Sequence, residues 1–337
     1  MNTQTKKEAA APLGVIGSLT TGFEMVGQHL GLIVLPLLLD LFLWLGPRLS
    51  IAPLFEQIIA LLASQPASDP AMARQVELAV QLLEQSSEQF NLLSLLSMVP
   101  LLDVPSLLAQ HALETVTPLG EARVFMITSE FTLILWAVVL IPAGLALGFL
   151  YLNSLSRQIR AMRLPDENED AGQVVQGSNV VGKFISVFLF VAGLMVAIVM
   201  LIPLWALVIG MILVIAPPIG FLAWSMSIGL GGYMALHLLF VVPGVLLGDR
   251  GLFRATVESF MLIQMRLPSV MGLILLVVVI YEGLGFVWSL PSGDSWALLV
   301  GIIGNGCIAT GLTAAAFVFY QDQIEQLPKF NRALTNT

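Results

Sequence analysis

The chain has 337 residues, of which 57% are hydrophobic and 11% are charged, and its mean hydropathy is +0.92. Soluble domains carry about a quarter charged residues, so this composition excludes a soluble globular protein and is typical of one embedded in a bilayer. The net charge of −8 argues against nucleic acid as a partner.

The longest uncharged stretch, from Phe184 to Gly248, contains no Asp, Glu, Lys or Arg. One crossing of the hydrocarbon core needs about 20 apolar residues, so this stretch predicts two or three crossings. Two crossings leave eleven Lys and Arg residues on the side of the N-terminus and three (Arg48, Arg74 and Arg123) on the other, whereas three crossings give six against eight. Because Lys and Arg concentrate in cytoplasmic loops, we predict two crossings, with a turn near Pro217-Pro218.

The sequence thus predicts an all-α, polytopic integral membrane protein with six transmembrane helices and an outer helical cap. We expect it in a bacterial-type plasma membrane, with both termini cytoplasmic. In chain order the predicted elements are an inner tail and lead-in (1–25), span 1 (26–46), an outer helical segment (47–125), span 2 (126–152), an inner loop (153–183), spans 3 and 4 (184–248), an inner interfacial helix (249–267), spans 5 and 6 (268–320) and an inner tail (321–337).

The outer segment is too long for a loop without structure of its own. Asp69 can cap a helix that begins at Pro70, and apolar residues then recur at helical spacing on one face. This face comprises Met72, Val76, Ala79, Val80 and Leu83. The apolar stretch Leu92 to Leu102 is too short to span a bilayer, so we expect it to join the cap.

Small residues at helical spacing predict close helix packing within the membrane. Gly144 and Gly148 form one pair, Gly193 and Ala197 a second, and Gly304 and Gly311 belong to a narrow face of the last span. We interpret these faces as contacts within the chain, with a subunit interface as the alternative.

Ionisable residues inside spans are costly and often functional. The carboxylates here are Asp40, Glu130 and Glu282, and the other polar candidates are His29, His237 and Asn305. One hypothesis is a polar pathway, or a cation or proton site, lined by Asp40, Glu282 and Asn305, with His29 as a further member. The alternative is that Asp40 and Glu130 reach the wet interface while Glu282 is protonated or hydrogen-bonded to a neighbouring helix. Glu282 is too far from the outer turn at Pro291 to reach water, so we expect it to face the bundle interior.

The sequence contains no GxSxG, Walker A or HExxH motif, and its single cysteine, Cys307, excludes an intramolecular disulfide. We therefore expect no enzymatic activity, no cofactor and no metal site.

The last 90 or so residues carry a recognisable pattern. Gly251, Ala255 and Ser259 are spaced at four, Arg266 follows, and Pro291 lies in a turn before a span that ends in Phe319-Tyr320-Gln321-Asp322. This part resembles six-span bacterial membrane proteins, including the membrane domain attached to some glycerophosphodiester phosphodiesterases. The resemblance implies a membrane fold, but not phosphodiesterase activity, because the catalytic domain of those enzymes is a separate soluble unit.

Two functions remain open. The first is a non-enzymatic accessory or scaffold subunit, bound to the lipid bilayer and to a membrane-protein partner or a second copy. The alternative is a transporter or channel-like protein that uses the outer-half carboxylates.

Overall fold

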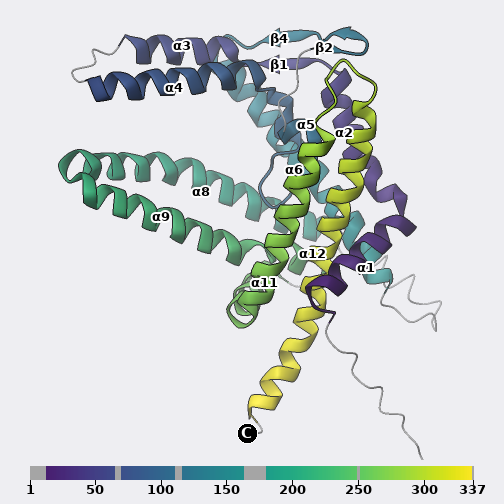
Figure 1. The fold of residues 1–337 in the computed structure, drawn as a ribbon. Helices are drawn as coiled ribbons and strands as arrows, with labels where there is room; N and C mark the ends of the chain where they lie inside the picture. Colours follow the sequence, from purple (N-terminus) through teal and green to yellow (C-terminus); the bar gives the residue numbers. More distant parts are fainter. Residues whose placement is uncertain (1–12, 65–69, 111–115, 163–179, 249–250, 336–337) are drawn as a thin grey trace, which may run out of the picture.

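The computed structural model describes residues 13–64, 70–110, 116–162, 180–248 and 251–335 as a bundle of long helices (Figure 1). Five helices are long and apolar enough to cross a membrane, and a bent pair supplies a sixth candidate span. The five are α6 (Glu130–Ala161), α8 (Val180–Ile215), α9 with α10 (Pro217–Leu238 and Val241–Gly248), α11 (Leu252–Trp288) and α12 (Leu298–Thr335). The predicted all-α, multi-pass membrane protein is confirmed.

The first span differs from the straight helix predicted for residues 26–46. Helix α1 (Gly14–Gln28) is followed by a 3₁₀ turn, η1 (Leu30–Ile33), and by α2 (Val34–Leu45), and the two halves meet at 92°. His29, with φ −129° and ψ 62°, interrupts the helix between them. Helix α1 then packs against α12, where a Cβ at Gly22 would lie 2.6 Å from the Ala315 nitrogen. The predicted lead-in is therefore a packed half of this bent pair.

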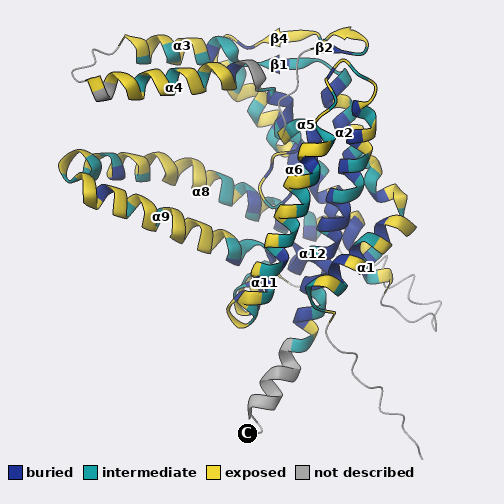
Figure 2. Cartoon of the chain, in the orientation of Figure 1, coloured by how far each residue is buried: buried dark blue, intermediate teal, exposed yellow. Residues whose placement is uncertain are grey.

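The uncharged central stretch forms the hairpin that the sequence predicts. Helix α8 ends at Ile215, Ala216 leaves the helical region, and α9 starts at Pro217. Beyond its first turns, the hairpin extends away from the bundle, and most of its surface is exposed (Figure 2). The second limb is broken at Leu239 and Phe240, shortly before Pro243.

Several predicted boundaries lie inside continuous helices. Helix α6 begins at Glu130 rather than 126 and runs past 152 to Ala161, and α12 runs past 320 to Thr335. The predicted interfacial helix and span 5 are both parts of α11, which is kinked at Arg266, two residues before Pro268. The predictions placed the span ends at charged residues, where the apolar surface ends. The helices continue beyond these residues because their backbone hydrogen bonds do not depend on apolar side chains. The predicted N-terminal tail, the predicted cap at Asp69, most of the inner loop and residues 249–250 lie outside the described residues.

The predicted outer segment contains a helical hairpin and two small pairs of strands. Helix α3 (Ala52–Ala63) packs on α4 (Pro70–Gln89), and the predicted face at Val76, Val80 and Leu83 is half-buried. Strand β1 (Arg48–Ser50) pairs in parallel with β4 (Val124–Met126), and β2 (Val116–Thr117) pairs antiparallel with β3 (Gly120–Glu121). We call this part of the bundle the strand end (Figure 1). Helix α1 and the end of α12 lie at the opposite end.

Residues 91–110, which we call the inserted segment, do not belong to a cap. They comprise a 3₁₀ turn, η2 (Leu92–Leu96), an irregular stretch and the short helix α5 (Leu107–Gln110). Leu93, Val99, Leu102 and Val104 are buried in the main hydrophobic core together with residues of α6. The prediction of a surface cap is wrong for this segment, because its apolar side chains are covered by the spans themselves.

Candidate functional site: a polar cavity beside the inserted segment

The inserted segment descends along α6 from an anchor at the strand end. The side-chain oxygen of Asn91 accepts hydrogen bonds from the backbone nitrogens of Leu49 (3.1 Å) and Leu93 (3.2 Å). Two glycines of α6 leave room for the backbone of the inserted segment. A Cβ at Gly144 would lie 2.8 Å from the Leu95 oxygen, and one at Gly148 would lie 1.6 Å from the Leu102 oxygen. Gly148 lies five turns into α6, which is ~27 Å from its start. The segment therefore reaches the middle of the bundle.

Asp40 of α2 holds the returning part of the segment. Its carboxylate is fully buried and accepts hydrogen bonds from the Ser106 hydroxyl (2.5 Å) and from the backbone nitrogens of Leu107 (3.0 Å) and Leu108 (3.2 Å). These nitrogens open α5 and have no partner within that helix. Asp40 thus acts as the cap of a helix on another segment, a structural role that neither sequence hypothesis includes.

The tip of the inserted segment is a tight turn that ends at Asp103. Leu101 has a positive φ of 63°, and the Ser97 hydroxyl donates to the Val104 carbonyl (2.6 Å) across the turn. Irregular backbone at membrane depth is tolerated where it is buried in protein, and Val99, Leu102 and Val104 are buried in the core here.

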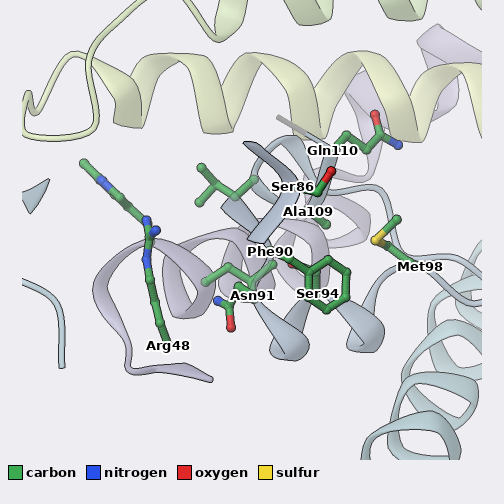
Figure 3. A pocket seen from close by; sticks show the side chains of 11 residues that line it. Arg48, Ser86, Phe90, Asn91, Ser94, Met98, Ala109 and Gln110 are labelled. Carbon is green, nitrogen blue, oxygen red and sulfur yellow. The ribbon is translucent and has the colours of Figure 1, made fainter. Parts of the chain in front are cut away.

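Three pockets follow the inserted segment. The strand-end pocket has a volume of about 220 Å³ and lies among β1, α4, η2 and α5, with Arg48, Phe90 and Gln110 in its wall (Figure 3). The loop pocket, about 340 Å³, shares Met98 and Gln110 with it. The central cavity, about 280 Å³, shares Leu101 and Asp103 with the loop pocket. The pockets therefore lie in sequence from the strand end toward the middle of the bundle.

The central cavity is lined by the inserted segment, α6, α10, α11 and α12, and its wall is mostly apolar. Asp103, Tyr281 and Thr313 contribute side-chain oxygen atoms, and Leu152, Phe240 and Phe317 are among the apolar lining residues. Tyr281 lies about two turns from the end of α11, which is ~10 Å. A mostly apolar cavity with three polar side chains at this depth fits the usual form of a binding site, a concave apolar surface with few polar groups.

Asp103 carries the one charged side chain of the residues that line the central cavity. Its side chain is exposed, and it lines both the central cavity and the loop pocket. Among the described residues, no ion pair to Asp103 is formed. A carboxylate in such surroundings has no compensating positive charge.

Other hydroxyl and amide groups gather around Asp103. Tyr281 interacts electrostatically with Asp103 and Asp40, and its hydroxyl lies beside the Gln110 side chain. Tyr151 of α6 lies beside the hydroxyls of Thr310 and Thr313. The Tyr151 and Thr310 hydroxyls are buried, but their contacts are too loose for hydrogen bonds of good geometry. A polar cluster therefore lies across α6, α11 and α12 around the cavity.

The structure separates the predicted polar residues. Asp40 is next to the polar cluster, but Glu282 is exposed on the outside of α11, so the prediction that it faces the interior is wrong. The neighbouring residue, Tyr281, points inward instead. Glu130 is exposed in the first turn of α6, as expected for an interfacial carboxylate. Asn305 of α12 is 2% exposed and does not line the central cavity.

Neither of the two predicted histidines lines the central cavity. His29 forms the bend between α1 and η1. His237 is fully buried, its Nδ1 donates to the Tyr233 carbonyl (2.8 Å), and its ring packs on Tyr233 and Phe260. Among the described residues, no group of three His, Cys, Asp or Glu side chains could hold a metal ion.

The predicted packing glycines have different partners from those expected. Gly144 and Gly148 contact the inserted segment rather than another span, Gly304 lies on the Trp288 ring, and Gly311 lies on Phe23 of α1. A Cβ at Gly193 would meet nothing within 4 Å, so the packing predicted for Gly193 and Ala197 is not formed within the described chain.

Sequence reasoning missed Asp103. A signal was present, because an apolar stretch too short to span and followed by Asp103-Val104-Pro105 is a pattern compatible with a segment that enters the membrane and turns back. No protein-family model, curated protein or solved structure matches this chain. The resemblance to the membrane domain of glycerophosphodiester phosphodiesterases stays a prediction.

Proposed function

We propose that the protein is a non-enzymatic membrane protein of the transporter or channel-like class, which takes up a small solute in the central cavity from the strand end. The observation that supports this role most strongly is the row of pockets along the inserted segment, which ends at the uncompensated carboxylate of Asp103. Intramembrane carboxylates of this kind mark substrate and ion pathways in many membrane proteins. Asp103 takes the place that the sequence hypothesis gave to Glu282.

The proposal includes a bacterial-type plasma membrane with both termini in the cytoplasm. The excess of Lys and Arg on the N-terminal side supports this orientation. The strand end, with its pocket, is then the outer end.

Cysteine labelling tests the route. In a Cys307→Ser background, Asp103→Cys should react with a cationic, membrane-impermeant methanethiosulfonate reagent from the same side of the membrane as Glu84→Cys on α4. Val279→Cys, exposed on the apolar surface of α11, is the matched control and should stay unlabelled because lipid covers it. If Asp103→Cys is as unreactive as Val279→Cys in intact cells and in inside-out vesicles, no aqueous route reaches the cavity and the proposal is wrong.

A second candidate function, an accessory or scaffold subunit, is favoured by the hairpin of α8 and α9. The hairpin extends from the bundle, is apolar on every side, and has small residues, Gly193, Gly210 and Gly229, whose surroundings within 4 Å are open. Such surfaces let another membrane helix approach closely. The candidate partners are another membrane protein or a second copy of this chain.

Crosslinking in native membranes tests this second function. Gly229→Cys in the Cys307→Ser background should give one defined product, of twice the monomer mass for a second copy or of another fixed mass for a partner protein. Val279→Cys on α11 serves as the control. A product pattern identical to that of the control would count against a docking role for the hairpin.

A further inference from the structure

The central cavity contains one carboxylate and no basic residue in its lining. Basic side chains line other pockets instead: Arg48, which is half-buried, lines the strand-end pocket. A solute that pairs with the Asp103 carboxylate must therefore bring its own positive charge, because the cavity lining supplies none.

The remaining lining indicates the kind of cation. Apart from Asp103, only the hydroxyls of Tyr281 and Thr313 offer side-chain oxygen atoms to the cavity. A hard metal ion such as Ca²⁺ takes six to eight oxygen ligands, and Mg²⁺ requires near-octahedral coordination, so this set of oxygens does not suit either. An ammonium group needs only a few acceptors and is attracted to aromatic faces, which Tyr281, Phe240 and Phe317 provide.

The apolar wall indicates what the cation is attached to. Leucine, valine, proline and alanine side chains from five parts of the chain form most of the surface around Asp103. The volume of about 280 Å³ is close to the lower end of the range for small-molecule sites. A small hydrocarbon body would fill this space and leave its charged end at the carboxylate.

We infer that the central cavity is a binding site for a small organic ammonium cation, with the carboxylate of Asp103 as the counter-charge and Tyr281 and Thr313 as hydroxyl partners. This inference rests on the proposed function and narrows it to one class of solute. Asp40 is already used by Ser106, Leu107 and Leu108, and Glu282 points away from the cavity, so neither is the counter-charge.

The test compares two probes of nearly equal shape, benzylamine, which is protonated at neutral pH, and benzyl alcohol, which is neutral. Binding to the purified full-length protein in detergent is measured by titration calorimetry. Benzylamine should bind at least roughly tenfold more tightly than benzyl alcohol, since one charge-assisted hydrogen bond is worth about that factor. Asp103→Asn should remove this difference, whereas Asp294→Asn, an exposed carboxylate in the loop before α12, should preserve it.

Equal binding of the two probes, or unchanged benzylamine binding by Asp103→Asn, would overturn the inference. If Asp103→Asn does not fold, Ala316→Leu replaces it, because this change narrows the cavity and keeps the carboxylate; undiminished benzylamine binding would then place the site elsewhere. Failure of both probes to bind also overturns the ammonium site. The labelling of Asp103→Cys decides separately whether the proposed solute route exists.

Discussion

The carbonyl oxygen of Leu102 lies directly against Gly148 of α6, at the position where any other residue would carry its Cβ. The contact brings the tip of the inserted segment to the middle of the bundle, next to Asp103. Glycine at position 148 is therefore a condition for the cavity, and not only for the packing of a helix.

Gly148→Ala should destabilise the protein. The added methyl group would stand 1.6 Å from the Leu102 oxygen, and such overpacking costs about 1 to 3 kcal/mol or more. Gly193→Ala is the matched control, because nothing lies within 4 Å and alanine favours a helix by up to about 1 kcal/mol over glycine. Thermal unfolding in detergent compares the two, and equal effects would show that the close contact is absent.

Asp40→Leu should be much more damaging than Glu282→Leu. The first change leaves the Ser106 hydroxyl and the backbone nitrogens of Leu107 and Leu108 without their acceptor, at about 1 to 3 kcal/mol for each buried group. Glu282 is exposed, so its replacement by leucine should be tolerated. The apparent melting temperatures of both variants in detergent provide the measurement. Comparable losses would mean that Glu282 also has buried partners.

The hairpin of α3 and α4 allows a similar comparison on neighbouring residues. Val80→Asp should lower the melting temperature, because Val80 is half-buried against α3, whereas Gln81→Asp should have little effect, because Gln81 is exposed. Burial of a valine side chain is worth roughly 1.5 to 3 kcal/mol when complete, so a part of this loss is expected. A hairpin without a packed face would give the same result for both variants.

Orientation can be tested with single cysteines at the two ends of the bundle. Glu84→Cys on α4 and Ala161→Cys at the end of α6, each in a Cys307→Ser background, are both exposed positions. An impermeant thiol reagent added to intact cells should label Glu84→Cys and leave Ala161→Cys unlabelled. The reverse pattern would place the strand end in the cytoplasm.

The sequence predicted where the helices lie along the chain better than it predicted which helices and side chains contact one another. Uncharged length and the prolines near 217 predicted the hairpin, because it depends on local chemistry alone. The helix end predicted at Pro268 is instead a kink at Arg266 within α11. After Pro268, helix α11 is apolar on nearly every side, so its periodicity could not show that Tyr281, rather than Glu282, faces the interior. The glycines of α6 indicated a close approach, but local spacing does not identify what approaches. Asp103 depends on a contact between distant parts of the chain, which only the assembled bundle reveals.

The bend at His29 also has a consequence for biosynthesis. It turns α1 across α12, so that Gly22 lies on Ala315 and Phe23 lies on Gly311, and the first helix of the described chain packs on the last. During translation, α1 emerges long before its partner exists. The N-terminal half of the bent pair can reach its final position only after the ribosome has released α12, and until then its small-residue face lacks the partner on which it packs.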